Sequence, residues 1–130
     1  MKLASGLVTV MVATSSFGGF CQQPSANPCD TPKTTIEMRE CAAFKLKNAE
    51  KDLEQVYSTM LSRLSDEAHK KSFRASQEAW QKYRDAEAEF EGHFYNGGTI
   101  QLQIKLDCMT RTTQARTKEL RQLLKDEFDH

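Results

Sequence analysis

A stripe of apolar residues spaced three or four positions apart is the feature that most restricts the fold of this chain. No proline or glycine interrupts it, and its members are Ala42, Leu46, Ala49, Leu53, Val56, Met60 and Leu64, flanked by Phe44, Tyr57 and Leu61. This spacing places the apolar side chains on one face of an α-helix. The sequence therefore predicts one long amphipathic helix that ends near Leu64 and packs through that face.

The start of this helix carries its own local signals. Pro24, Pro28 and Pro32 exclude a helix from residues 21–33, which we expect to form a short extended arm. Thr34, followed three residues later by Glu37, has the pattern of a capping box, in which each side chain satisfies the other's backbone N–H. The helical domain is thus predicted to begin at residue 34.

A second helix is predicted from the Ser65-Asp66-Glu67 segment to about Glu91. The segment supplies a capping residue and two acids, which the positive end of the helix dipole favours. Gly92 is expected to end the helix. Its apolar face is expected to consist of four aromatic residues, with small alanines beside them: Phe73, Trp80, Tyr83 and Phe90.

A third helix is predicted from about Ile100 to Phe128, after a turn at Asn96-Gly97-Gly98. Its apolar stripe is Leu102, Leu106, Met109, Leu120, Leu123 and Leu124. Residues 100–106 alternate with a period of two and would also suit a short strand, but no partner strand is near. Three long helices with short connections predict an all-α antiparallel bundle over residues 34–128.

The first twenty residues differ from the rest of the chain. Met1-Lys2 supplies a positive start, and an apolar run from Leu3 to Ala13 follows it. This is the pattern of a secretory signal peptide, and the run is too short to span a bilayer. We expect residues 1–20 to be removed and the protein to be periplasmic or secreted. A buried N-terminal helix is the alternative.

Four cysteines become relevant to stability if the protein is exported, because disulfides persist in oxidising compartments. Of the three possible pairings, we favour Cys29 with Cys41, which would staple the arm to the first helix. Cys108 would then pair with Cys21 or stay free. An unpaired Cys108 could have a redox role. A lipid anchor at Cys21 is disfavoured, because the residue before it is the bulky Phe20.

Composition and missing motifs exclude several function classes. Lysine and arginine total 18, as do aspartate and glutamate, so a nucleic-acid partner is disfavoured. The three histidines have no metal-ligand spacing and no CxxC occurs, so no metal is expected. No nucleophile motif or phosphate loop is present. We therefore expect a binding protein without a cofactor, not an enzyme.

Gln77, Trp80, Tyr83 and Arg84 lie at helical spacings on one side of the second helix. A tryptophan with polar neighbours is either a core anchor or part of a recognition surface. The core reading is favoured, with Gln77 as partner of the indole N–H. Arg84 is expected to pair with a carboxylate on another helix, and Asp85 with a different group, because adjacent residues of a helix do not face each other.

The C-terminal end of the same helix is acidic, with Asp85, Glu87, Glu89 and Glu91. These residues either form a solvated face, offset by Lys82 and basic residues of the third helix, or an acidic docking surface for a basic partner. In the second interpretation Glu87, Glu89 and Glu91 bind together with the adjacent loop residues Asn96, Gly97 and Gly98.

Several motifs together resemble the LprI-type lysozyme-inhibitor family of exported bacterial proteins. They are Cys29-Asp30-x-x-x-Thr34-Thr35-x-Glu37-Met38-x-x-Cys41-Ala42, Asp52-Leu53-x-x-Val56-Tyr57, Gln77-x-x-Trp80-x-x-Tyr83-Arg84-Asp85-Ala86-Glu87, Gly97-Gly98-Thr99, and Cys108 with Thr113-x-x-Arg116-x-x-x-Leu120. The resemblance implies a disulfide-stapled helical envelope protein, and some members are implicated in lysozyme inhibition. This chain departs from the family pattern at Ala88. Such proteins usually carry a cysteine near this position, and that cysteine would pair with Cys108.

Two functions follow from this combination. The first is an inhibitor that occludes a basic lysozyme through residues 87–99. The second is a non-catalytic structural or assembly factor of the envelope that binds another protein through its helical surface.

Overall fold

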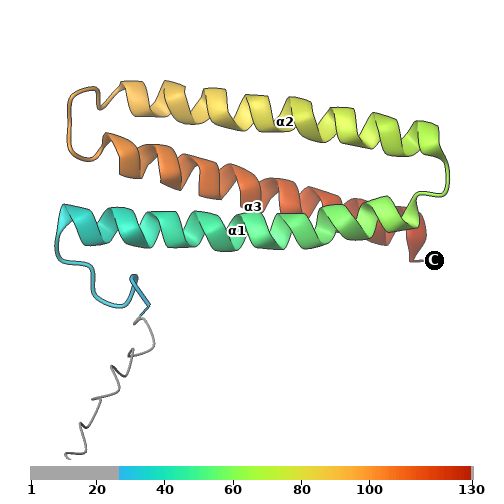
Figure 1. The fold of residues 1–130 in the computed structure, drawn as a ribbon, viewed down its shortest axis with the longest axis horizontal. Coiled ribbons are helices and arrows are strands. Elements are labelled where there is room, and N and C mark those ends of the chain that lie inside the picture. Colours follow the sequence, from blue (N-terminus) through green and yellow to red (C-terminus); the bar gives the residue numbers. More distant parts are fainter. Residues whose placement is uncertain (1–26, 130) are drawn as a thin grey trace, which may run out of the picture.

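The computed structural model describes residues 27–129, and this part of the chain is all-α (Figure 1). It contains α1 (Thr35–Arg63), α2 (Glu67–His93) and α3 (Gln101–Phe128). None of these helices is long and apolar enough to cross a membrane. The expected signal peptide and Cys21 lie outside the described residues.

The predicted capping box forms at the start of α1. Thr34 Oγ1 accepts a hydrogen bond from the Glu37 backbone N–H at 3.2 Å, and Glu37 Oε2 accepts from the Thr34 N–H at 2.9 Å. Glu37 Oε2 also accepts from the Lys33 N–H at 2.7 Å. These bonds stabilise the carboxylate and lower the pKa of Glu37, the Lys33 bond most of all.

The N-cap of α2 lies one residue after the predicted Ser65, and the helix ends two residues after the predicted Glu91. The N-cap is Asp66, whose carboxylate accepts from the backbone N–H groups of Ala68 and His69, which lowers the pKa of Asp66. At the other end the helix continues through Gly92 to His93. Gly92 is buried, so it permits close packing instead of ending the helix, and the left-handed residue of the turn is Gly97, with φ of 76°.

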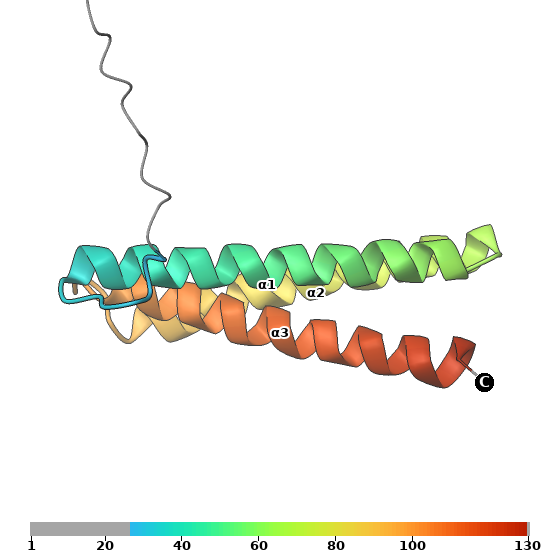
Figure 2. The same cartoon turned by 90° about the horizontal axis from the view of Figure 1, so that it is seen from below.

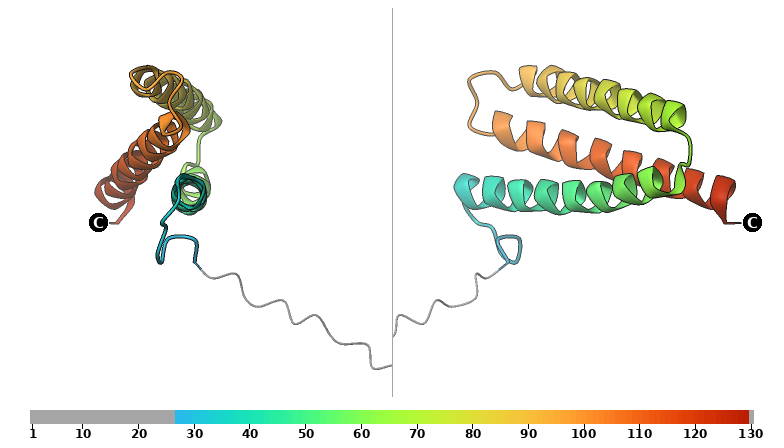
Figure 3. Two further views of the ribbon diagram at one scale, coloured as in Figure 1. Left: turned by 90° about the vertical axis from the view of Figure 1, so that its left-hand side faces the viewer. Right: turned by 45° about the vertical axis from the view of Figure 1, so that its right-hand side comes forward.

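Consecutive helices run antiparallel, so α1 and α3 run in the same direction (Figure 1). The backbones of α1 and α2 each lie close to that of α3, whereas α1 and α2 meet through longer side chains, in the Tyr57–Phe73 stack and the Arg84–Glu50 ion pair. The end-on view on the left of Figure 3 shows α3 beside both of them, and Figure 2 shows α3 diverging from α1 toward the C-terminus. This arrangement leaves a space between α1 and α2 that their own side chains line.

The apolar core lies between α1 and α3. The buried residues of α1 all fall on the predicted stripe or at the disulfide: Cys41, Ala42, Leu46, Ala49, Leu53, Val56 and Met60. Leu53, Val56 and Met60 pack with Leu120 of α3, and partly buried apolar residues surround this cluster, namely Leu64, Phe73, Trp80, Leu124 and Phe128. The helix-forming stripe therefore also supplies most of the core.

The predicted apolar face of α2 is wrong in part. Phe73 and Trp80 pack against the core, but the side chains of Tyr83 and Phe90 are 56% and 60% exposed. The buried residues of α2 are Gln77, Ala88 and Gly92 instead. Positions 77, 80, 84, 88 and 92 follow the helical repeat toward the core, and this repeat turns Tyr83 and Phe90 toward solvent.

The disulfide between Cys29 and Cys41 is present and confirms the favoured pairing. It ties the N-terminal arm to the second turn of α1, where Cys41 is buried. Cys108 of α3 is completely buried and has no disulfide partner within residues 27–129.

Candidate functional site

The connection between α2 and α3 forms a compact tip at one end of the molecule (Figure 1). We call residues 87–102 the hairpin tip. Asn96 orders it: its Oδ1 accepts from Gln101 Nε2 at 2.6 Å, and its Nδ2 lies 2.9 Å from His93 Nδ1. The Gly98 N–H donates to the Tyr95 carbonyl at 2.9 Å, which closes the turn around Gly97. The predicted loop residue Asn96 thus has a structural role in holding the tip.

Exposed apolar side chains gather on the hairpin tip. Phe94 is 72% exposed and Phe90 is 60% exposed, and their rings meet edge to face with centroids 5.2 Å apart. Tyr95, Ile100 and Leu102 are also exposed. Sequence reasoning missed this surface because it assigned Phe90 to the core, although the i, i+4 spacing of Phe90 and Phe94 was a usable signal. Clustered exposed aromatics are typical of a binding surface.

The acidic residues of the tip are largely paired within the chain. Glu89 binds Lys105 Nζ at 2.6 Å, and Glu91 binds Arg111 Nη2 at 2.6 Å. The Glu91 carboxylate raises the pKa of Arg111. Both cations come from α3, which favours the interpretation of a charge-balanced face over that of an unopposed acidic surface. Glu87, the third predicted acidic contact, is half-buried.

Arg84 links α2 to α1, as its spacing predicted. Its Nη1 donates to Glu50 Oε1 of α1 at 3.1 Å, and its guanidinium carbon lies 5.5 Å from the centre of the Trp80 ring. The expectation for Asp85 was wrong, because Arg84 Nε also donates to Asp85 Oδ1 at 2.9 Å. The Cβ atoms of adjacent helical residues diverge, but the long arginine side chain folds back far enough to reach its neighbour.

Gln77 is buried and partners Arg116 rather than the Trp80 indole. Its Oε1 accepts from Arg116 Nε at 3.2 Å, and Arg116 Nη2 donates to Ser76 Oγ at 3.1 Å. The predicted motif therefore divides by position: Gln77, Trp80 and Arg84 face inward, while Tyr83 and Asp85 are exposed.

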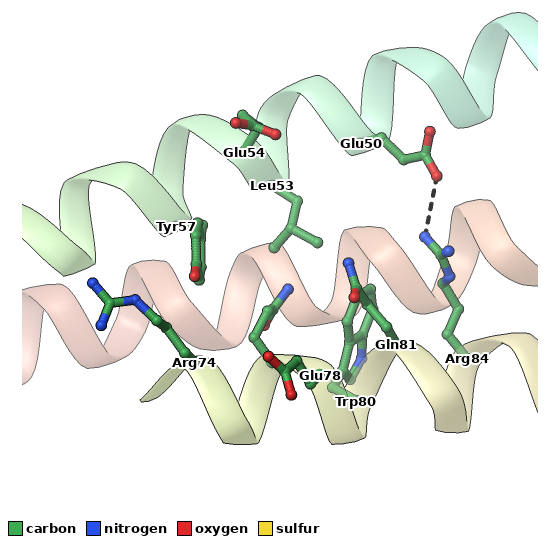
Figure 4. Close-up of a pocket in the computed structure, with 10 residues that line it drawn as sticks. Glu50, Leu53, Glu54, Tyr57, Arg74, Glu78, Trp80, Gln81 and Arg84 are labelled. Carbon is green, nitrogen blue, oxygen red and sulfur yellow. Dashed lines mark hydrogen bonds and ion pairs between the residues drawn. The ribbon is translucent and has the colours of Figure 1, made fainter. Parts of the chain in front are cut away.

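Gln77, Trp80 and Arg84 line a groove of about 420 Å³ between α1 and α2 (Figure 4). We call it the α1–α2 groove. Its lining combines aromatic, charged and amide side chains from both helices: Glu50, Leu53, Glu54, Tyr57, Arg74, Gln77, Glu78, Trp80, Gln81 and Arg84. The Arg84–Glu50 ion pair crosses it at one end.

Two features of the described residues concern metal binding and thiol reactivity. Within residues 27–129, no group of three or more histidine, cysteine, aspartate or glutamate side chains is placed to bind a metal. Burial, and then the neighbouring Glu91 carboxylate, raise the pKa of the Cys108 thiol. A buried, protonated thiol is a poor nucleophile.

Comparison with known proteins places the chain in a family. The family model described as Lysozyme inhibitor LprI matches residues 26–120. An uncharacterized protein of Rhizobium meliloti strain 1021 is 25% identical, over 79% of this chain and 82% of that protein. The crystal structure of a DUF1311 family protein from Pseudomonas putida KT2440 superposes with a TM-score of 0.62 at 27% identity, covering 69% of this chain and 93% of that one.

The matched residues include the disulfide, the inward-facing motif residues of α2 and the hairpin tip. They extend over well more than half of the chain. The chain therefore belongs to the LprI lysozyme inhibitor family.

Proposed function

We propose that this protein is an exported, non-catalytic inhibitor of lysozyme that blocks its target by occlusion with the hairpin tip. Family membership supports the activity, and the exposed aromatic cluster of Phe90, Phe94 and Tyr95 supports the location. Aromatic side chains contribute disproportionately to protein–protein affinity, since they bury much area at a small entropic cost. Two antiparallel helices hold this cluster at the end of the molecule, where it is accessible to a cleft.

Charge also supports the hairpin tip as the contact surface, but less strongly than the aromatic cluster. Glu89 is paired with Lys105, but the Glu89 side chain is still 71% exposed. An exposed carboxylate can contact a second cation, so Glu89 could bind a basic side chain of a lysozyme although Lys105 already balances its charge. Glu87, Glu91, Asn96, Gly97 and Gly98 complete the proposed contact region, with the glycines allowing close approach of the backbone.

A lytic assay with the purified protein tests the proposal. We expect Phe94→Ala and Tyr95→Ala each to weaken inhibition about tenfold or more, the size of a hot-spot truncation. Tyr83→Ala is the matched control, because Tyr83 is an exposed aromatic of α2 outside the tip. Inhibition that survives both tip substitutions would reject the tip as the contact surface.

The envelope-factor alternative makes a different prediction for the same reagents. Under that function, no lysozyme type would be inhibited at micromolar protein. A complex with an envelope protein would form instead, and Phe94→Ala would abolish it. Under the inhibitor proposal, at least one lysozyme type is inhibited by the unaltered protein.

Export is tested by the intact mass of the protein recovered from the producing cell. We expect a mass that lacks about twenty N-terminal residues and gains two hydrogens on reduction of the Cys29–Cys41 bridge. An added acyl mass would instead indicate lipidation at Cys21, and retention of Met1 with the full leader would reject removal of a signal peptide.

A further inference from the structure

We propose that the α1–α2 groove binds a neutral oligosaccharide, as an activity separate from the hairpin tip. The groove contains the motif residues Gln77, Trp80 and Arg84, to which lysozyme occlusion by the tip assigns no role. It is lined by residues 50–57 and 74–84, which precede the hairpin tip along the chain. Its volume of about 420 Å³ falls in the range of small-ligand sites.

The apolar part of the groove is aromatic and held in place. Arg84 lies over the Trp80 ring at 5.5 Å, and Phe73 stacks on Tyr57 with ring centroids 5.1 Å apart. Both Trp80 and Tyr57 are half-buried and line the groove, so part of each side chain is accessible from it (Figure 4). Sugar rings present a face of C–H groups that packs on aromatic rings, while their hydroxyls stay free for hydrogen bonds.

The polar part of the groove has unused hydrogen-bonding capacity. Four lining side chains are exposed and form no side-chain hydrogen bond or ion pair with any residue in the described range 27–129: Glu54, Arg74, Glu78 and Gln81. Carboxylates only accept, a guanidinium only donates, and an amide does both. A sugar hydroxyl donates and accepts at one atom, so neighbouring hydroxyls can satisfy this mixed set.

The same mixture disfavours other ligand classes. A cation attracted by Glu54 and Glu78 would meet Arg74, and an anion attracted by Arg74 would meet two carboxylates. A purely apolar ligand would strip water from these charged groups without replacing their hydrogen bonds, which is costly. A neutral, hydroxyl-rich ligand avoids all three penalties.

Trp80 gives this proposal a local reporter, because it is the only tryptophan of the chain. Trimers of three neutral sugars, N-acetylchitotriose, cellotriose and maltotriose, are titrated into the folded protein up to millimolar concentration. We expect a saturable change in tryptophan fluorescence with at least one of them. No change with any of the three would overturn the proposal.

Matched variants of α2 locate the site. Arg74→Ala and Gln81→Ala should each raise the dissociation constant about tenfold, whereas Lys71→Ala and Lys82→Ala, at exposed positions outside the groove, should leave it unchanged. Equal binding by all four variants would overturn the proposal. Saturable, Gln81-dependent binding of a lysine-rich peptide in place of the sugars would identify a peptide groove and also overturn it.

The two surfaces are distinguished by running the lytic assay on the same variants. Gln81→Ala should lose sugar binding and keep lysozyme inhibition, while Phe94→Ala should do the reverse. If the protein does not inhibit lysozyme, the sugar titration therefore still tests whether the α1–α2 groove binds oligosaccharide. Loss of both activities in Gln81→Ala, with unchanged helicity by circular dichroism, would contradict the separation of the two sites.

Discussion

α1 and α2 both pack along α3, but the side chains that they bury against it differ in kind. The buried face of α1 is entirely apolar and packs around Leu120. α2 buries Gln77, Ala88 and Gly92, and polar groups connect it to α3: Arg116 to Gln77, Lys105 to Glu89 and Arg111 to Glu91. The α1–α3 pair is joined mainly by apolar packing. α2 is joined to α3 mainly by small residues and polar contacts, and Phe73 and Trp80 add its apolar contacts with the core.

The two interfaces contribute differently to the fold: α1–α3 mainly stabilises it, and α2–α3 mainly positions α2. Burial of apolar area gives about 25 cal/mol per Å², while an exposed ion pair gives about 1 kcal/mol or less. The α1–α3 pair therefore supplies most of the stability of the fold. The charged contacts of α2 help to set its register on α3. Phe90 and Phe94 stay exposed in the hairpin tip, while Trp80 both packs against the core and lines the α1–α2 groove.

The largest effect should come from truncating the centre of the α1–α3 interface. Leu120 is 1% exposed, so Leu120→Ala removes buried contacts and leaves a cavity, at a cost of about 3 kcal/mol. Leu123→Ala, at a 47% exposed position of the same helix, should cost about 0.5 kcal/mol or less. Denaturant unfolding measures both. Equal costs would show that the α1–α3 interface is not the main source of stability.

Removal of the disulfide should have an effect of similar size. The Cys29–Cys41 bridge closes a loop with a sequence separation of 12, and constraining such a loop in the unfolded chain is worth about 3 kcal/mol. We expect the Cys29→Ser, Cys41→Ser double variant to unfold at lower temperature in calorimetry. Leaving Cys108 in place keeps the α2–α3 contacts unchanged. An unaltered midpoint would mean that the arm adds nothing to the α1–α3 pair.

The two helix pairs also differ in how far the sequence predicts them. The apolar stripe and the Thr34–Glu37 capping box predicted α1, its buried face and its start, because both signals are local. The buried face of α2 was predicted less well, since aromatic residues were ranked above Gln77 and Gly92 as core positions. The partners of these polar and small residues, Arg116 and Lys105, are set by the register of α3, which the sequence of α2 alone does not contain.

The α1–α2 groove and the hairpin tip were also predicted only in part, because both depend on how the helices pack together. Arg84 was expected to pair across helices, and it does so with Glu50. This contact lies at the end of a groove because the backbones of α1 and α2 both lie close to α3, while only their longer side chains meet each other. Such an arrangement is a property of three helices together, so motif spacing on one of them does not reveal it.

A smaller effect is expected where α2 approaches α3 most closely. A Cβ added at Gly92 would lie 2.6 Å from Lys105 Cγ and 2.7 Å from Lys105 Cε. Alanine favours helix formation over glycine by about 1 kcal/mol, but the overlap should outweigh this gain and destabilise the protein by about 1 kcal/mol net. In a Lys105→Ala background the overlap disappears, so Gly92→Ala should become stabilising. A cost of the same size in both backgrounds would contradict close packing against Lys105.

The smallest effect tests whether charge or packing holds α2 in register. Lys105 and Glu89 meet at 2.6 Å, but the Glu89 side chain is 71% exposed, so the pair should contribute only about 0.5 kcal/mol. A double-mutant cycle with Glu89→Gln and Lys105→Met measures this coupling free of other effects of either change. Because salt screens exposed charges, the coupling should shrink at about 1 M ionic strength, while the cost of Leu120→Ala should not. A coupling well above about 1 kcal/mol at high salt would show that α2 is held as firmly as α1, and the contrast between the two helix pairs would fail.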